Sequence, residues 1–262
     1  MPELPDVETL ARTLRRRTAG RRIDRVRVLS PKTIRSPAPR AFARLMRGRR
    51  IERVGRRGKY LLIDLDGALT LIVHLRMTGD FAIAPAGAPL HPHTRVLFAL
   101  GAEELRFVDQ RRFGHMDLLP AARVHRLSGL RRLGEEPLAR GFTLNRFRPL
   151  LRGRRGMLKG LLLRQDLVAG IGNLYADEIL FQARLRPARP VESLRPPDVA
   201  RLHGAIRAVL RRATDGLARS GRPGATLLDA RGRGGACPRC GRALVPARVA
   251  GRGTYYCRAC QR

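Results

Sequence analysis

Acidic residues and lysine are scarce in this chain of 262 residues, and long apolar runs are missing. Only 21 residues are Asp or Glu against 54 Lys or Arg, which gives a formal net charge of +33. Such a charge opposes compaction unless a polyanion offsets it, so nucleic acid is the first candidate partner and an anionic membrane the second. No apolar run reaches the ~18 residues of a membrane span, so none is expected. The start lacks the basic-then-apolar pattern of a signal peptide, and we expect a cytoplasmic, nucleoid-associated protein.

Lysine is rare even among the basic residues. Three lysines, Lys32, Lys59 and Lys159, stand against 51 arginines (54 − 3). A bias of this kind is typical of a G+C-rich genome as well as of function, so surface arginine alone is a weak indication of a binding site. A retained lysine either marks a position that needs a compact ammonium group or is retained by chance, and the residues alone leave both interpretations open.

Cysteine occurs only near the end of the chain, as two C-x-x-C pairs. The pairs are Cys237/Cys240 and Cys257/Cys260, with sixteen residues between them. Two such pairs at this spacing favour a tetrahedral site for one structural Zn²⁺, because four thiolates close the coordination sphere. Two disulfides in a secreted protein are the alternative, which the missing signal pattern disfavours.

The first residues, Met1-Pro2-Glu3, combine a potential nucleophile with a carboxylate. A small second residue favours removal of Met1, which leaves Pro2 with a secondary amine. An α-amino group titrates near pH ~8, so part of it is neutral and able to attack a sugar carbon as an amine nucleophile. The alternative is an ordinary helix start, where proline and acidic residues are common.

Hydrophobic periodicity divides the chain into a β-rich first half and a helical second half. Residues 7–17 predict a helix, and residues 40–47 predict a second, short one. Val, Ile and Leu-rich segments predict strands at 22–29, 50–54, 59–66, 68–76, 95–100 and 104–108, with 85–92 as a loop. Helices are predicted at 121–132, 143–151, 157–164, 174–182 and 197–217, followed by a loop at 219–236. The predicted fold class is α+β, with an N-terminal helix and an antiparallel β-sandwich first. We expect domains at 1–125, 126–230 and 231–262.

The order of these features resembles the formamidopyrimidine-DNA glycosylase/endonuclease VIII family over the whole length. The resemblance is carried by residues 1–9, 57–60, 74–79, 109–114, 168–178 and the cysteine pairs. It implies a helix–two-turn–helix element in the second domain and a C-terminal zinc finger. It also implies a bifunctional DNA glycosylase/AP lyase that excises oxidised bases such as formamidopyrimidine and 8-oxoguanine. The implied partner is double-stranded DNA with damaged bases or abasic sites, bound by a monomer.

The resemblance assigns catalytic roles to Pro2, Glu3 and Lys59. Pro2 is implied to attack C1′ of the damaged nucleotide and to form an iminium, after which the strand is cleaved by β,δ-elimination. Glu3 is implied to be the acid/base residue. Lys59 is similar to a lysine on a hairpin turn that supports a phosphate and catalysis.

The resemblance also implies DNA contacts. A glycosylase must flip its target nucleotide out of the duplex, and Met77, Arg111 and Phe113 are similar to the side chains that fill the gap. Packing in the sheet core is the alternative for Met77 and Phe113. Further residues are implied to contact phosphate or to face DNA; they are His74, Arg112, Lys159, Asn173 and Arg252. Gly170 and Gly172 are interpreted as glycines that let the backbone approach a phosphate.

Two departures from the family pattern bear on the substrate. Asp6 stands where the family usually has Glu, so its carboxylate is one methylene shorter. Residues 214–236 are also shorter than the region that covers the flipped base in enzymes acting on oxidised purines. Two alternatives therefore stay open: an endonuclease VIII-like enzyme for oxidised pyrimidines or abasic sites, and a non-catalytic binder of damaged DNA.

Overall fold

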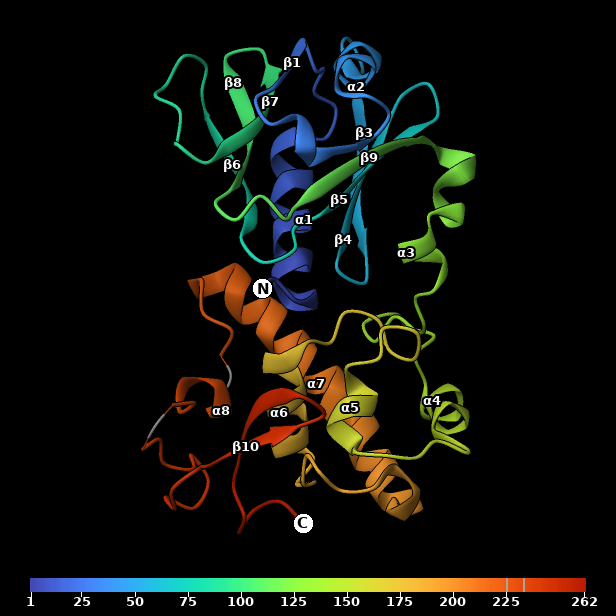
Figure 1. Ribbon diagram of the computed structural model, residues 1–262, viewed down its shortest axis with the longest axis vertical. Coiled ribbons are helices and arrows are strands. Elements are labelled where there is room, and N and C mark those ends of the chain that lie inside the picture. The colour runs from blue at the N-terminus through green and yellow to red at the C-terminus, as the bar shows by residue number, and fades with distance from the viewer. Residues whose placement is uncertain (225, 233) are drawn as a thin grey trace. The chain divides into compact units, whose positions relative to one another are not determined.

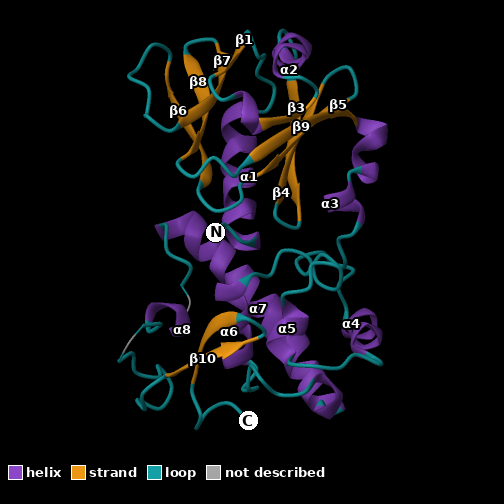
Figure 2. Ribbon diagram, viewed as in Figure 1, coloured by secondary structure: helices purple, strands orange, loops and turns teal. Residues whose placement is uncertain are grey.

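The computed structural model describes residues 1–224, 226–232 and 234–262 (Figure 1). The chain forms two compact units, of which the first comprises Met1–Pro2 and Asp6–Arg131. The second comprises Glu3–Pro5 and Arg132–Arg262, so three N-terminal residues belong with the C-terminal half. The predicted order, strands first and helices after, is confirmed (Figure 2).

The first unit is a β-sandwich with two helices. Its strands are β1 (Arg25–Val28), β2 (Ile34–Ser36), β3 (Ile51–Arg57), β4 (Tyr60–Leu65), β5 (Leu69–His74), β6 (Gly79–Pro85), β7 (Thr94–Leu100), β8 (Glu103–Asp109) and β9 (His115–Pro120). One sheet has the order β1-β7-β8-β6 and the other β2-β9-β5-β4-β3. Alternating apolar side chains of both sheets share one core with α1 (Leu4–Thr18) and α2 (Pro39–Met46). The sandwich fixes the strand ends and turns that carry the candidate residues.

Strand prediction was incomplete where residue propensity is low. The strands β2, β6 and β9 were not predicted; β6 contains Gly79, Asp80 and Pro85, which are rare in strands. Every residue of β6 pairs with a residue of β8, and this pairing outweighs the low strand propensity of the segment. The helix predicted at 121–132 is wrong, because extended Leu127 separates a 3₁₀ turn (Ala121–Arg126) from α3 (Ser128–Arg131).

The second unit is helical and ends in a small β-hairpin. Its helices are α4 (Leu144–Leu151), α5 (Leu158–Leu162), α6 (Asn173–Gln182), α7 (Pro196–Ser220) and α8 (Thr226–Asp229), with a 3₁₀ turn at Val191–Ser193. The hairpin consists of β10 (Val245–Val249) and β11 (Arg252–Tyr256). α7 ends at Gly221, whose φ of +67° is the left-handed cap conformation that glycine adopts without strain. The loop predicted at 219–236 contains α8, and its residues 225 and 233 lie outside the described residues.

α6 is the buried helix of this unit. Seven of its ten residues are buried, Asp177 and Glu178 among them. The carboxylate of Glu178 accepts hydrogen bonds from Gln182 Nε2 at 2.7 Å and from the backbone N–H of Leu227 at 2.8 Å. In the part of the chain that the structure describes, no helix combines the length and apolarity required to cross a membrane.

Candidate functional site

The carboxylate of Glu3 occupies the N-terminus of α6, within the second unit. Its oxygens accept backbone N–H groups of Gly172 at 2.7 Å, Leu174 at 2.9 Å and Tyr175 at 3.3 Å. The first helical residues have N–H groups without an intrahelical partner, and the helix dipole adds positive potential there. Glu3 is 2 % exposed, so these donors replace the water that a surface carboxylate would bind. They stabilise the negative charge and fix the direction of the side chain.

Gly170 and Gly172 make room for the N-terminal segment of the same chain. A Cβ on Gly172 would lie 2.3 Å from the carboxyl carbon of Glu3, and one on Gly170 would lie 2.6 Å from Cβ of Leu4. Gly170 also has φ +91° and accepts a hydrogen bond from the N–H of Leu4 at 3.0 Å. The absence of a side chain at the two glycines therefore lets Glu3 and Leu4 pack against them. The sequence did not predict this structural role, which is additional to the predicted approach of a phosphate.

Pro2 directly precedes this anchored segment and belongs to the first unit. Pro2 is half-buried, and Met1 before it is 51 % exposed. Because Glu3 and Leu4 are both held by hydrogen bonds to residues 170–175, the positions open to the neighbouring Pro2 nitrogen are restricted. The residues that follow Pro2 are thus held rigidly, which suits the predicted role of Pro2 as a nucleophile.

Lys59 lies in the turn between β3 and β4 of the first unit, and His74 ends the neighbouring strand β5. Gly58, with φ +55°, turns the chain between β3 and β4, and the next residue, Lys59, is 9 % exposed. The pKa of His74 is lowered to about 3. Burial is the largest cause, followed by the charges of Arg76, His115 and Lys59. The ring is therefore neutral near pH 7, and its Nδ1 accepts the N–H of Arg76 at 3.0 Å. The remaining proton belongs on Nε2, which makes that atom a hydrogen-bond donor suited to a phosphate.

Three residues predicted to fill the gap in DNA are exposed on loops of the first unit. Met77 is 39 % exposed and Phe113 is 53 % exposed, so the alternative of core packing does not hold for either side chain. The guanidinium of Arg111 lies 4.8 Å from the centre of the Phe113 ring. Arg112 is also exposed and has φ +58°, a left-handed conformation that costs a non-glycine residue some strain.

Asp109 and Thr78 organise these two loops, although neither was assigned a role from the sequence. Asp109 is 1 % exposed, and its carboxylate accepts the N–H of Gly114 at 2.7 Å, the N–H of Arg111 at 3.2 Å and the hydroxyl of Thr78. The Thr78 oxygen in turn accepts the N–H of Arg111 at 3.1 Å. One buried carboxylate thus ties the loop with Met77 to the loop with Arg111 and Phe113. The sequence shows an Asp directly after the strand predicted at 104–108 and before turn residues, but it does not show that this Asp is buried.

Lys159 is buried in the second unit, where the resemblance implied a lysine that faces DNA. Its side chain is 0 % exposed and its Nζ lies 2.6 Å from Asp177, also 0 % exposed. The ammonium donates to the Thr254 hydroxyl at 2.7 Å and to the Gly253 carbonyl at 3.0 Å. Burial lowers the pKa of Lys159 and raises that of Asp177, and the ion pair opposes both shifts. In this structure the ammonium of Lys159 does not reach the surface.

The carbonyl of Gly253, next to Arg252 at the start of β11, accepts three side-chain donors from separate segments. They are Lys159 of α5 at 3.0 Å, Asn173 at the start of α6 at 3.1 Å, and Arg231 at 3.0 Å. Arg231 also lies 3.2 Å from Asp177 and 5.3 Å from the centre of the Tyr255 ring. These contacts hold the hairpin backbone while the side chain of Arg252 stays exposed. Arg231 was not singled out by the sequence.

Replacing Lys159 with methionine is expected to lower the free energy of unfolding by about 3–5 kcal/mol, because the buried charge of Asp177 would lose its closer cation and keep Arg231 at 3.2 Å. Urea unfolding of K159M measures this loss. K32M, at the exposed Lys32, is the matched control and is expected to change stability by less than about 0.5 kcal/mol. A K159M protein as stable as K32M would contradict the structural role of the pair. The double variant K159M/D177N is expected to recover part of the loss.

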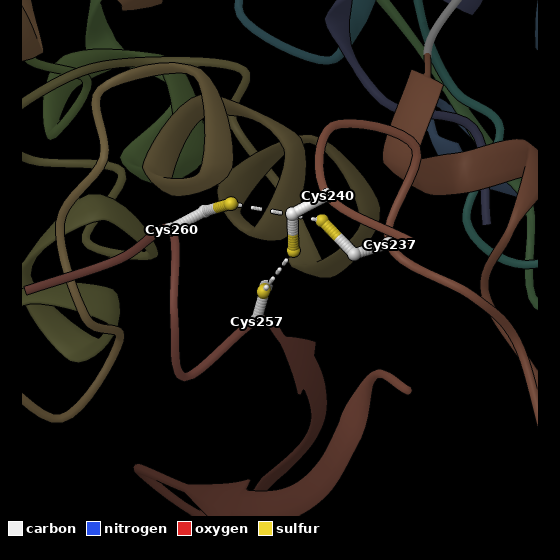
Figure 3. A group of neighbouring side chains, drawn as sticks. All are labelled: Cys237, Cys240, Cys257 and Cys260. Carbon is white, nitrogen blue, oxygen red and sulfur yellow. Dashed lines mark hydrogen bonds between the residues drawn. The ribbon is translucent and has the colours of Figure 1, made fainter. Parts of the chain in front are cut away.

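The four cysteines converge on one point (Figure 3). Their Sγ atoms all lie within 4.8 Å of one another, and two of the pairs are 3.5 Å (Cys240 and Cys257) and 3.9 Å (Cys237 and Cys260) apart. A tetrahedral zinc with Zn–S bonds of about 2.3 Å requires S–S distances of about 3.8 Å. All four are free thiols, which excludes the disulfide alternative. The residues form the predicted site for one structural Zn²⁺.

The zinc site is joined to α6 through its first knuckle. The guanidinium of Arg239 lies 4.3 Å from the centre of the Phe181 ring and donates to the Phe181 carbonyl at 3.3 Å. Phe181 also shares a small core with Cys237, Leu244 and Cys257. The finger and the helix that receives Glu3 are therefore parts of one packed unit.

Asp6 is half-buried in the first turn of α1. A carboxylate in a first turn suits the helix dipole, as the Glu usual in the family would. This position gives Asp6 a structural role independent of the substrate.

Comparison with known proteins agrees with this arrangement. The family model described as the formamidopyrimidine-DNA glycosylase N-terminal domain matches residues 1–116. The formamidopyrimidine-DNA glycosylase H2TH domain matches 133–221, and the zinc finger found in FPG and IleRS matches 234–262. The expected zinc finger and helix–two-turn–helix element are confirmed.

Curated relatives match over nearly the whole length. Formamidopyrimidine-DNA glycosylase of Moorella thermoacetica is 47 % identical over 259 residues, covering 93 % of each chain. The protein of the same name from Pelotomaculum thermopropionicum is 42 % identical and covers 100 % of this chain and 99 % of its own.

Solved structures are similar in fold throughout. A complex of Lactococcus lactis Fpg with DNA containing an abasic site has a TM-score of 0.91 at 31 % identity, with 99 % of both chains covered. A complex of the same protein with DNA containing an oxidized pyrimidine has a TM-score of 0.91 at 32 % identity and covers 100 % of both chains. Sequence, fold and site agree: this chain belongs to the formamidopyrimidine-DNA glycosylase family.

Proposed function

We propose that this chain is a bifunctional DNA glycosylase and AP lyase of base excision repair. The observation that carries the proposal is the Glu3 carboxylate, seated on the N-terminus of α6 directly after Pro2. A carboxylate held next to a terminal secondary amine provides a proton-transfer group beside a nucleophile. Binding DNA requires neither a nucleophile nor a proton-transfer group, so this arrangement favours an enzyme over a non-catalytic binder.

Chemistry begins with the amine of Pro2, after removal of Met1. Its nitrogen lone pair attacks C1′ of the damaged nucleotide, the bond to the base breaks, and the base leaves with the electron pair and takes up a proton. The nitrogen then loses its own proton, and its lone pair expels O4′ as the C1′–O4′ bond breaks and O4′ takes up a proton, so the sugar ring opens to an iminium. The iminium acidifies the hydrogen on C2′, so a base removes that proton and the 3′ phosphate leaves by β-elimination. A second elimination releases the 5′ phosphate. Water then hydrolyses the iminium and restores the amine.

Glu3 is proposed to transfer protons and to stabilise the cation in these steps. Its three N–H donors favour the ionised form, which suits a base and an electrostatic partner for the developing positive charge on the sugar. To act as an acid it must first gain a proton from the reaction. Lys59 is proposed to support a backbone phosphate near the reacting sugar.

DNA contacts are proposed from exposed or half-buried groups of both units. Met77 and Phe113 enter the base stack where the nucleotide has left, and Arg111 bonds to the orphaned base. His74, Arg112, Asn173 and Arg252 bind phosphates, with His74 as a neutral donor. Lys159 is proposed to act indirectly, by holding the backbone beside Arg252. The arginine excess adds affinity that falls with salt and does not depend on sequence.

Oxidised bases are the proposed substrates, with formamidopyrimidine and 8-oxoguanine first because the relatives are named for the former. The structure of Lactococcus lactis Fpg with DNA containing an oxidized pyrimidine supports the alternative that oxidised pyrimidines are the substrates. The short stretch between α7 and the finger is the feature of this chain that favours it. We propose that the protein works as a monomer in the cytoplasm, on the nucleoid.

Borohydride trapping on an abasic duplex tests the chemistry. Protein lacking Met1 is expected to form a covalent adduct at Pro2, located by mass spectrometry of the N-terminal peptide. P2G is expected to lose base excision by about 10²-fold or more while it keeps slow trapping, because a primary amine still forms a Schiff base. Absence of an adduct on abasic and lesion-bearing duplexes, from protein with a free Pro2, would leave only DNA binding. A lesion panel at fixed salt separates oxidised purines from pyrimidines.

A further inference from the structure

A pocket of the second unit lies apart from every residue assigned to the reaction. It has a volume of about 550 Å³ and is formed by the end of α4, the segment 152–155, the turn Val191–Ser193 and the first turn of α7. Pockets of about 300–1,000 Å³ are the usual size for bound ligands. Its apolar part is lined by Leu151, Val191, Leu194 and Val199.

Backbone hydrogen bonds hold the walls of this pocket together. The N–H of Val191 donates to the Gly156 carbonyl at 2.9 Å, and that of Leu158 donates to the Arg189 carbonyl at 2.9 Å. The segment after α4 and the segment before α7 are thereby fixed to each other. The pocket is preformed and does not depend on the packing of flexible side chains alone.

Four arginines surround the apolar part and outnumber the single acidic residue of the lining, although the charge of Arg154 also acts on Asp166. Arg148, Arg152 and Arg155 are exposed and Arg154 is half-buried. Among the described residues, none of the four forms an ion pair, whereas the nearby Asp198 is already bonded to Arg189 and Arg201. Glu192 is the one acidic residue in the lining. The pocket therefore joins an aliphatic floor to an excess of guanidinium groups.

We propose that this pocket binds a disordered acidic segment of a partner protein through carboxylates and an apolar side chain. Carboxylates match the guanidinium rim, often in bidentate pairs, and a leucine- or phenylalanine-like side chain matches the floor. Duplex DNA fits less well, because an exposed phosphate backbone offers nothing apolar to the four aliphatic side chains. The site extends beyond the proposed enzymatic function and does not depend on it.

Fluorescence anisotropy with a labelled peptide tests this assignment on the intact zinc-containing protein. The probe is a short peptide of Asp and Glu with interspersed Leu, and its control carries Ser in place of every Leu. R152E/R155E is expected to weaken binding of the Leu peptide by about tenfold or more through lost pairs and new repulsion. R211E/R212E is the matched control, because Arg211 and Arg212 are exposed outside the pocket and the change in net charge is the same. It is expected to weaken binding by less than about threefold.

A second variant separates the floor from the charge. L194S is expected to weaken binding of the Leu peptide and to leave the affinity for the Ser peptide, which binds more weakly, unchanged. The melting temperature of L194S shows whether the variant is folded. The proposal would be overturned if the two peptides bound equally well, or if the two double variants weakened binding equally. Either outcome would mean that a cationic protein attracts acidic peptides without a specific site. The proposal would also be overturned if R152E/R155E weakened binding of an abasic duplex far more than R211E/R212E, since the arginines would then belong to the DNA surface.

Discussion

Replacement of Glu3 with glutamine is expected to slow base excision by about 10²–10⁴-fold, the usual range for loss of a general acid–base group. Glutamine has the same shape but no charge. One end of its amide is an NH₂ group, which cannot accept the N–H groups of Gly172, Leu174 and Tyr175 that the carboxylate now accepts. The substitution therefore removes the proton-transfer group and misdirects the side chain. Single-turnover excision on a lesion-bearing duplex measures the effect.

Two controls separate chemistry from folding in that experiment. E3D keeps the negative charge, but its side chain is one methylene shorter and places the carboxylate farther from the donors of α6. It is therefore expected to be more active than E3Q and less active than the parent protein. Borohydride trapping on an abasic duplex reports on Pro2 itself and is expected to fall less than excision does. An E3Q protein that excises bases at more than about a tenth of the parent rate would rule out Glu3 as the acid/base residue.

Loss of the zinc site is expected to have the largest effect on structure. Binding of structural zinc to small finger domains is worth about 10–16 kcal/mol in apparent free energy, and such domains are unfolded without it. C240S removes one of four ligands, so bound zinc is expected to drop from one per chain to nearly none, and the hairpin β10–β11 to become disordered. Cleavage of an abasic duplex is expected to fall by about 10²-fold or more, because Arg252 loses its rigid support.

Metal analysis and amide hydrogen exchange of residues 237–262 measure these changes. R242S is the matched control, since Arg242 is an exposed residue of the same finger and not a cysteine ligand. It is expected to retain zinc, hairpin protection and most of the activity. Full zinc content and unchanged cleavage in C240S would contradict the assignment of a four-thiolate site.

Some features could be predicted because their cause is local in the sequence. The spacing of Cys237, Cys240, Cys257 and Cys260 restricts the ligand chemistry whatever the rest of the chain does. The longer helices follow from apolar periodicity and end signals, as at α7 with Gly221 after it. The strand β6 could not be predicted, because pairing with the distant β8 outweighs its low propensity.

By itself, then, the sequence determined the α+β order, the family resemblance, the zinc ligands and the pairing of an amine with Glu3. Only the tertiary structure decided that Lys159 is buried, since its partner Thr254 is 95 residues away. It also decided that Gly172 makes room for Glu3, that Asp109 organises the loops of Met77 and Phe113, and that four arginines surround a pocket. The physical reason is common to all: a side chain's exposure and charge depend on groups brought together by the core, and spacing along the chain does not record them.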